Sequence, residues 1–139
     1  MTGTPAIDWD TLRAMAREAT QRSYAPYSRV SVGAAALTTS GELISGSNVE
    51  NASYGLTLCA ECSLVSDLAR HQGGRLVAAS VVAGDGQPIA PCGRCRQLLY
   101  EFGGPDMLID SGEGHEPKRL SELLPDAFGP DDLPVRRNP

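Results

Sequence analysis

The sequence has few aromatic residues, no long apolar run and no excess of basic side chains. Aromatic residues make up 5% of the chain, and 12 Lys and Arg against 17 Asp and Glu leave a net charge of −5. A nucleic-acid-binding protein normally carries a basic face, so we expect no polynucleotide partner. No apolar run reaches the roughly 18 residues of a membrane helix. Residues 1–10 lack a basic segment followed by an apolar stretch. We therefore expect a cytoplasmic protein without membrane contact.

What is present fits a single compact domain. The chain has 139 residues, of which 41% are hydrophobic and 21% charged, close to average globular usage. A chain of this length forms one core, and its 15 glycines and 10 prolines indicate many turns between short elements. We expect one domain over residues 1–139, in which residues from about 129 to 139 form a flexible tail.

The pattern of apolar residues predicts alternating helices and strands. A helix capped by Asp8 is expected to run to Gln21, followed by a hairpin of strands from Val30 to Ala36 and from Glu42 to Val49. We expect loop from Ser111 to Lys118, further helices over 56–70, 91–102 and 120–124, and strands over 76–83 and 107–109. This order predicts an α/β fold, with a mixed sheet covered by helices on both faces.

The four cysteines form two C-x-x-C pairs, Cys59 with Cys62 and Cys92 with Cys95. In a chain without a secretion signal, such pairs indicate a metal or redox site before a disulfide. Each pair lies at the start of a predicted helix, where backbone N–H groups and the helix dipole stabilise thiolates, the form that binds Zn²⁺. Both sulfur atoms of a pair are expected on one side of their helix. We therefore predict that two helix N-termini meet around one zinc ion.

The number of sulfur ligands separates the functional classes. Four ligands would make a closed structural site in a zinc-binding module, whereas three leave a position for water. Zinc lowers the pKa of that water toward neutrality, and Glu61 is close enough in the chain to exchange its proton. A dithiol redox protein is the other alternative, although it needs only one of the two pairs. A zinc site with a Pro-Cys-x-x-Cys pair and a glutamate matches the general pattern of nucleobase deaminases.

These residues resemble the small, homotetrameric class of cytidine deaminases. The resemblance extends over most of the chain, in segments 27–28, 32–35, 48–54, 59–61, 91–97 and 123–130. It implies a three-layer α/β/α fold with a mixed five-stranded sheet that includes an N-terminal antiparallel hairpin. It also implies hydrolytic deamination of cytidine and 2′-deoxycytidine to the uridine products and ammonia, in pyrimidine salvage.

The resemblance implies one zinc ion per subunit, bound by Cys59, Cys92 and Cys95. Glu61 would take a proton from the zinc-bound water, protonate the ring nitrogen N3 and pass a proton to the leaving amine. A related deaminase acting on a modified cytosine nucleoside shares these zinc motifs and is the alternative within the enzyme class.

The resemblance also implies a substrate site shared between subunits of a homotetramer. Asn48 and Glu50 would hydrogen-bond the ribose 3′-hydroxyl, and the Ala60 backbone N–H would hold the pyrimidine O2. Tyr54 would lie near the sugar. Phe128 of a neighbouring subunit would stack on the pyrimidine. A carboxylate and an amide without a cationic cluster suit a free nucleoside better than a nucleotide.

Two positions depart from the family pattern. Cys62 stands where the family usually has an arginine that hydrogen-bonds the ligand sulfurs, and we expect Cys62 to pack as a small apolar residue. Three thiolates on Zn²⁺ sum to −1, so we hypothesise that Arg94 or Arg96, with helix N-terminal amides, offsets this charge. Val30 stands where the family commonly has phenylalanine near the substrate, which bears on affinity more than on reaction type.

Overall fold

The computed structural model describes residues 3–134, which form a mixed five-stranded sheet covered by helices. The strand order is β2-β1-β3-β4-β5. The strands are β1 (Val32–Thr38), β2 (Leu43–Ser47), β3 (Leu76–Ala83), β4 (Leu108–Ile109) and β5 (Lys118–Arg119). The α-helices are α1 (Trp9–Thr20), α2 (Ala60–Arg70), α3 (Gly93–Gly103) and α4 (Leu120–Leu123), and the 3₁₀ turns are η1 (Tyr54–Leu56) and η2 (Pro130–Asp132).

Helix α1 begins where the sequence predicts. The Asp8 side chain accepts a hydrogen bond from the Thr11 N–H at 3.1 Å, which caps one of the free N–H groups of the first turn. Leu12, Ala16 and Ala19 form the buried face of the helix. This face lies against β1 and β3, so α1 covers one side of the sheet.

The sheet combines an antiparallel hairpin with a parallel unit. Strand β1 pairs antiparallel with β2 and with β3, while β3 and β4 are parallel and joined through α3. The residues of β1 are small because helices pack on both of its faces. A Cβ atom on Gly33 would lie 2.0 Å from the Ala16 carbonyl oxygen, so only glycine permits this approach of α1.

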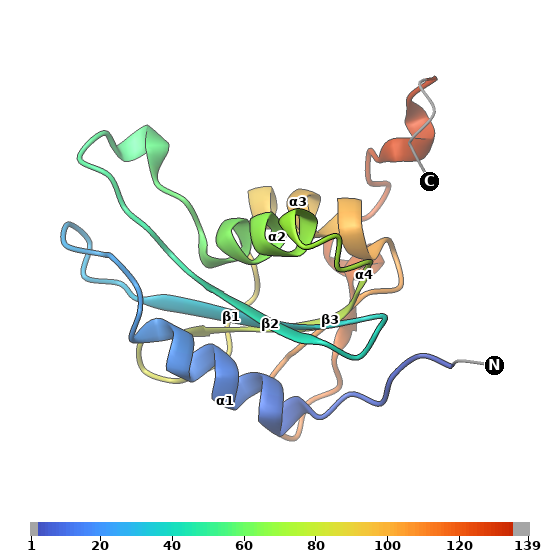
Figure 1. Cartoon of the computed structure of the whole chain (residues 1–139), viewed down its shortest axis with the longest axis horizontal. Coiled ribbons are helices and arrows are strands. Elements are labelled where there is room, and N and C mark those ends of the chain that lie inside the picture. The colour runs from blue at the N-terminus through green and yellow to red at the C-terminus, as the bar shows by residue number, and fades with distance from the viewer. Residues whose placement is uncertain (1–2, 135–139) are drawn as a thin grey trace.

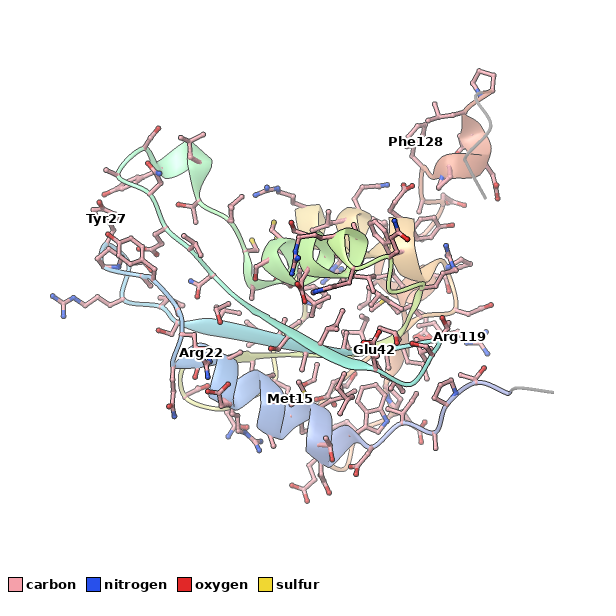
Figure 2. All side chains as sticks on the ribbon, viewed as in Figure 1. Met15, Arg22, Tyr27, Glu42, Arg119 and Phe128 are labelled. Atoms are coloured by element: carbon pink, nitrogen blue, oxygen red, sulfur yellow. The ribbon has the colours of Figure 1, made fainter. Side chains whose placement is uncertain are left out.

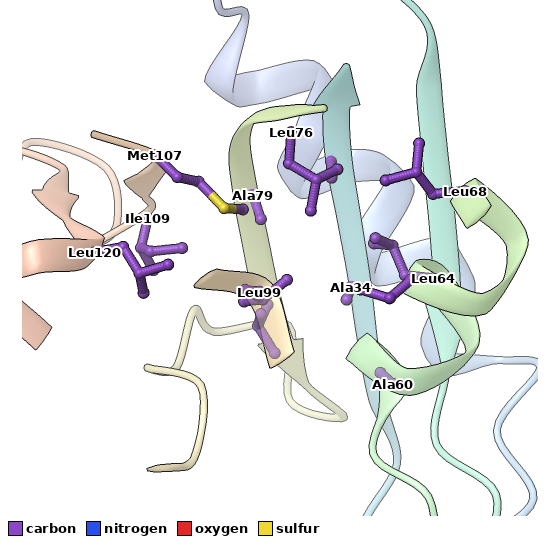
Figure 3. Close-up of a cluster of buried hydrophobic side chains, with 13 residues drawn as sticks. Ala34, Ala60, Leu64, Leu68, Leu76, Ala79, Leu99, Met107, Ile109 and Leu120 are labelled. Atoms are coloured by element: carbon purple, nitrogen blue, oxygen red, sulfur yellow. The ribbon is translucent and has the colours of Figure 1, made fainter. Parts of the chain in front are cut away.

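Three layers result from this arrangement, as Figure 1 shows: α1 lies on one face of the sheet, and α2 and α3 lie on the other. Between the sheet and α2 and α3 lies the larger apolar core, which includes Leu64, Leu68, Leu99 and Met107 (Figure 3). A smaller cluster around Leu12 fills the space beneath α1. The predicted three-layer α/β/α fold is confirmed.

Several predicted boundaries change. Lys118, expected to end a loop, and Arg119, for which no element is predicted, form β5 and pair antiparallel with β4. Helix α2 begins at Ala60 rather than near Leu56, because η1 and an isolated bridge between Val49 and Leu58 occupy the preceding residues. The predicted tail begins with Gly129 and the η2 turn, and residues 135–139 lie outside the described part of the chain. No helix in residues 3–134 is long and apolar enough to span a membrane.

Candidate active site

Two helix N-termini meet at a cluster of three cysteines, as the sequence predicts. Cys59 is the N-cap residue of α2, Cys92 is the N-cap residue of α3, and Cys95 is buried in the first turn of α3. The three sulfur atoms lie within 4.8 Å of one another, and those of Cys59 and Cys92 are 3.9 Å apart. Strand β3 and the connection after it bring α3 beside α2, which joins cysteines 33 residues apart in sequence.

The cluster has the geometry of a zinc site. A tetrahedral ion with Zn–S bonds near 2.3 Å separates its sulfur ligands by about 3.8 Å, which agrees with the 3.9 Å between Cys59 and Cys92. Thiolates this close repel one another unless a cation lies between them. The N-termini of α2 and α3 add positive electrostatic potential to the same place. The described residues therefore provide three ligands that could hold one Zn²⁺ ion.

The protonation equilibria of the free thiols differ with their surroundings. Burial raises the pKa of Cys95, and the nearby Glu61 carboxylate raises it further. Burial also raises the pKa of Cys59. For Cys92, a hydrogen bond from the Cys95 backbone N–H lowers the pKa, as expected for an exposed thiol at a helix N-terminus. Of the three thiols, Cys92 is therefore the one that ionises most readily.

Cys62 lies outside the metal cluster. It is half-buried in α2. In residues 3–134, its sulfur atom does not belong to the group of ligand atoms that cluster closely enough to hold one metal ion. The expectation that both sulfurs of each C-x-x-C pair lie on one side therefore holds for Cys92 and Cys95 but is wrong for Cys59 and Cys62. Cys59 and Cys92 are both N-cap residues with an extended backbone, with φ of −69° and −66° and ψ of 161° and 166°, so the N-cap conformation does not explain why the two pairs differ. The position of Cys62 disfavours the closed four-cysteine site. A third thiol beside the pair of Cys92 and Cys95 fits a metal site better than a dithiol redox site, which needs only one pair.

Neither arginine expected to offset the thiolate charge donates a hydrogen bond to a sulfur atom in the described part of the chain. Arg94 donates to the Thr57 carbonyl oxygen at 3.4 Å. Arg96 donates to the carbonyl oxygens of Pro91 and Leu123, both at 2.8 Å. Arg96 therefore holds the backbone just before Cys92, and any effect on the sulfurs acts through space.

Glu61 combines burial with access to the cluster. It is the second residue of α2 and only 3% exposed. Burial raises its pKa, against the opposing effects of its own backbone N–H and of the Cys95 thiol. A carboxyl group whose pKa is raised by burial takes up and releases protons closer to neutral pH, which general acid–base catalysis requires.

A cavity of about 200 Å³ opens over the cysteine cluster. Ala60, the first residue of α2, lines it, and a first-turn backbone N–H has no acceptor within its own helix. Its other lining residues are Val32, Asn48, Thr57, Leu58, Cys59, Glu61, Val81, Ile89, Ala90, Pro91 and Cys92. The cavity thus combines an apolar wall with a few polar groups at one end, as small-molecule sites do.

Two of the predicted substrate residues lie in a second cavity beside the first. This cavity, of about 210 Å³, is lined by Tyr27, Ser28, Glu50, Asn51, Tyr54 and Thr57, and Thr57 is common to both cavities. Glu50 and Tyr54 therefore line the cavity that adjoins the cysteine cavity, whereas Asn48 lines the cysteine cavity itself. Val30 lines neither cavity, although its carbonyl oxygen accepts a hydrogen bond from Asn48.

Phe128 lies apart from both cavities. Its side chain is 57% exposed, and its carbonyl oxygen accepts a hydrogen bond from Gln97 Nε2 at 2.8 Å. Figure 2 shows Phe128 on the C-terminal segment, far from Tyr27, which lies on the loop between α1 and β1. A single chain therefore brings together every predicted site residue except Phe128.

Two serines to which the sequence pattern assigned no role orient Asn48 and Glu50. Ser23 donates a hydrogen bond to Asn48, and Ser28 donates one to Glu50. Ser28 belongs to the Tyr27-Ser28 segment of the family resemblance, which is the one signal that could have identified it. Ser23 carries no such signal.

Comparison with known proteins identifies relatives over nearly the whole chain. A family model described as the cytidine and deoxycytidylate deaminase zinc-binding region matches residues 8–110. A cytidine deaminase from Mycobacterium tuberculosis is 55% identical over 133 residues, which cover 96% of this chain and 98% of the relative. A cytidine deaminase from Halalkalibacterium halodurans is 43% identical over 131 residues, which cover 91% of this chain and 98% of that relative.

Solved structures agree with this relationship. A crystal structure of cytidine deaminase from Mycobacterium tuberculosis has a TM-score of 0.85 at 54% identity and covers 89% of this chain and 99% of its own. A crystal structure of cytidine deaminase from Mycobacterium leprae has a TM-score of 0.82 at 53% identity and covers 86% of this chain and 99% of its own. The family match, the identities and the shared fold agree with the three-cysteine cluster, and the chain therefore belongs to the cytidine and deoxycytidylate deaminase family.

Proposed function

We propose that the chain is a zinc-dependent cytidine deaminase that hydrolyses cytidine and 2′-deoxycytidine to uridine and 2′-deoxyuridine with release of ammonia. The observation that carries the proposal is the buried Glu61, which lines one cavity together with Cys59 and Cys92 of the three-cysteine cluster. Membership of the deaminase family and relatives named cytidine deaminase support the same reaction.

The chain's own residues supply proton transfer and orientation. A zinc ion bound by the three cysteines would lower the pKa of a coordinated water toward neutrality. The Glu61 carboxylate would accept one proton from the attacking water and pass it to the ring nitrogen N3. It would then accept the second proton of that water oxygen and pass it to the leaving amine, so that ammonia departs and the carbonyl of uridine forms. Each transfer requires a group that both accepts and releases a proton, and the raised pKa of Glu61 favours that exchange.

The lining of the two cavities favours an unphosphorylated nucleoside. The Ala60 N–H would donate to the pyrimidine O2, Asn48 and Glu50 would bind the ribose 3′-hydroxyl, and Tyr54 would lie near the sugar. Neither cavity has a lysine or arginine in its lining, and phosphate groups are usually bound by such cations.

We also propose that the enzyme is a cytoplasmic homotetramer that acts in pyrimidine salvage, with one zinc ion per subunit. Phe128 would complete the active site of a neighbouring subunit by stacking on the pyrimidine. Its exposure in one chain, away from the cavities of that chain, supports this assignment.

The ultraviolet absorbance of cytidine tests the reaction. We expect the purified wild-type protein to convert cytidine to uridine, and Glu61→Gln to lower the rate by at least about 100-fold while zinc content is retained. The matched control is Glu101→Gln, which changes an exposed glutamate of α3 and should leave the rate unchanged. A zinc-loaded wild-type protein that leaves cytidine intact would refute the proposal and favour a modified cytosine nucleoside as substrate.

A further inference from the structure

The segment between α1 and β1 is held by the two side chains to which we assign ribose binding. Asn48 Oδ1 accepts hydrogen bonds from the Ser23 hydroxyl at 2.5 Å and from the Val32 N–H at 2.9 Å. Asn48 Nδ2 donates to the Val30 carbonyl oxygen at 2.9 Å. These three contacts fix which side of the Asn48 amide is the donor and leave one Nδ2 hydrogen for a ligand.

Glu50 makes a second set of contacts to the same segment. Its Oε1 atom accepts hydrogen bonds from the Tyr27 N–H at 2.9 Å and from the Ser28 N–H at 3.1 Å. Its Oε2 atom accepts a hydrogen bond from the Ser28 hydroxyl. The Ser28 oxygen in turn accepts a hydrogen bond from the Val30 N–H at 3.0 Å, which directs the hydroxyl proton toward Glu50.

These contacts determine what Glu50 can bind. A carboxylate offers about four acceptor positions, and three of those on Glu50 are already taken. The hydrogen bonds from Ser28 and Tyr27 lower the pKa of Glu50, so the group stays ionised and acts only as an acceptor. What remains is room for about one donor, such as a single hydroxyl group.

We propose that Ser28 is a positioning residue that acts through Glu50 to set the preference of the enzyme for substrates with a ribose 3′-hydroxyl. The inference rests on the proposed function. Ser28 and Glu50 line the same cavity, so the hydrogen bond between them lies at the assigned sugar site. Tyr27, next to Ser28, contacts the Tyr54 ring with centroids 6.0 Å apart, and both tyrosines line that cavity.

The test compares cytidine with 3′-deoxycytidine as substrates for a small set of variants. Ser28→Ala removes the hydrogen bond to Oε2 and leaves Glu50 held only through Oε1, so the carboxylate is oriented less firmly and we expect kcat/KM for cytidine relative to 3′-deoxycytidine to fall about tenfold. The change should come from a higher KM for cytidine, with kcat and the KM for 3′-deoxycytidine nearly unchanged. Ser28→Thr keeps the hydroxyl and should keep the wild-type ratio.

Two further variants separate positioning from general damage to the loop. Ser31→Ala is the matched control, because the Ser31 hydroxyl makes no hydrogen bond in the described part of the chain. In a Glu50→Gln background, adding Ser28→Ala should change the ratio no further, since the serine acts through the carboxylate.

An unchanged ratio in Ser28→Ala, or an equal rise in KM for both substrates, would overturn the inference while leaving the proposed function intact. Independent, additive effects of Ser28→Ala and Glu50→Gln would also overturn it. No turnover of cytidine by the wild-type enzyme would instead refute the proposed function, and this inference with it.

Discussion

Replacing Asp110 by alanine tests the buried ion pair that joins α1 to the end of β4. Arg13 donates to the two carboxylate oxygens of Asp110 through Nε at 2.9 Å and Nη2 at 2.8 Å. The Ser80 hydroxyl and the Gly112 N–H also donate to this carboxylate, at 2.8 and 3.0 Å. The Arg13 and Asp110 side chains are only 9% and 2% exposed, so water cannot replace these contacts.

The structure sets the magnitude of the effect. Without Asp110 the buried Arg13 guanidinium keeps only the exposed Asp10 carboxylate, 3.3 Å from Nη1, as a charged partner, so we expect Asp110→Ala to lower the free energy of unfolding by about 3–5 kcal/mol. Arg13→Met combined with Asp110→Leu removes both charges and should lose much less than the sum of the two single changes. The control, Glu18→Ala, breaks the ion pair between Glu18 and Arg22, whose side chains are 55% and 74% exposed respectively. This change should lower the free energy of unfolding by less than about 1 kcal/mol.

Urea unfolding at pH 7 and one fixed protein concentration measures these differences. The reasoning is refuted if Asp110→Ala costs less than about 1 kcal/mol, the range of an exposed pair. It is also refuted if the double variant loses as much stability as the two single variants together, since the ion pair would then not be the cause.

The same carboxyl group predicts the direction of a pH effect. Burial favours its neutral form, but the hydrogen bonds from Arg13, Gly112 and Ser80 outweigh burial and hold the pKa of Asp110 below its ordinary value. A lowered folded-state pKa contributes stability above the unfolded-state pKa near 4, and that contribution disappears as pH falls through the folded-state value. The stability of Asp110→Asn should therefore fall less steeply than that of the wild type below about pH 4.

Four other variants test the cysteine cluster and the backbone packing at two glycines. Cys95→Ala should lower bound zinc well below one ion per chain, measured by metal analysis after dialysis, because it removes one of three clustered ligands. Cys62→Ala should keep its zinc, and loss of the metal would show that Cys62 is a ligand. Gly46→Ala should lower the free energy of unfolding by at least about 1–3 kcal/mol, because its Cβ would lie 2.3 Å from the Ala60 carbonyl oxygen. Gly55→Ala, where no atom lies within 4 Å of the new Cβ, should have little effect in the same unfolding assay.

Strong local signals predicted most of the elements. Asp8 capped a helix because its side chain accepts the Thr11 N–H, an interaction three residues away in sequence. The valine-rich run from Leu76 to Ala83 was predicted as a buried strand with the observed bounds, because both faces of that strand are covered. Strand β5 has no comparable signal, because its two exposed residues are charged and form a strand only where β4 offers backbone partners.

The candidate site was predicted less evenly. Cys59, Cys92 and Cys95 were predicted as ligands, and their clustering is confirmed, as is the proximity of Glu61. The assigned roles of Asn48, Glu50, Ala60, Tyr54 and Phe128 toward substrate remain predictions. The serines that orient Asn48 and Glu50 were not predicted, because a serine hydroxyl becomes informative only when its partner is known.

By itself, the sequence determined the chemistry available to this protein: thiols in pairs at two predicted helix starts and a carboxylate two residues after the first thiol. The pairing of the thiols and the position of the carboxylate both depend on spacings of two or three residues, which can be read directly from the sequence. Only the tertiary structure decided which thiols meet, because strand β3 and the connection to α3 bring Cys92 to 3.9 Å from Cys59 and leave Cys62 outside the cluster. Packing of α2 against the sheet likewise decided the burial that raises the pKa of Glu61. Proximity and desolvation depend on residues far apart in the chain, and no local pattern specifies them.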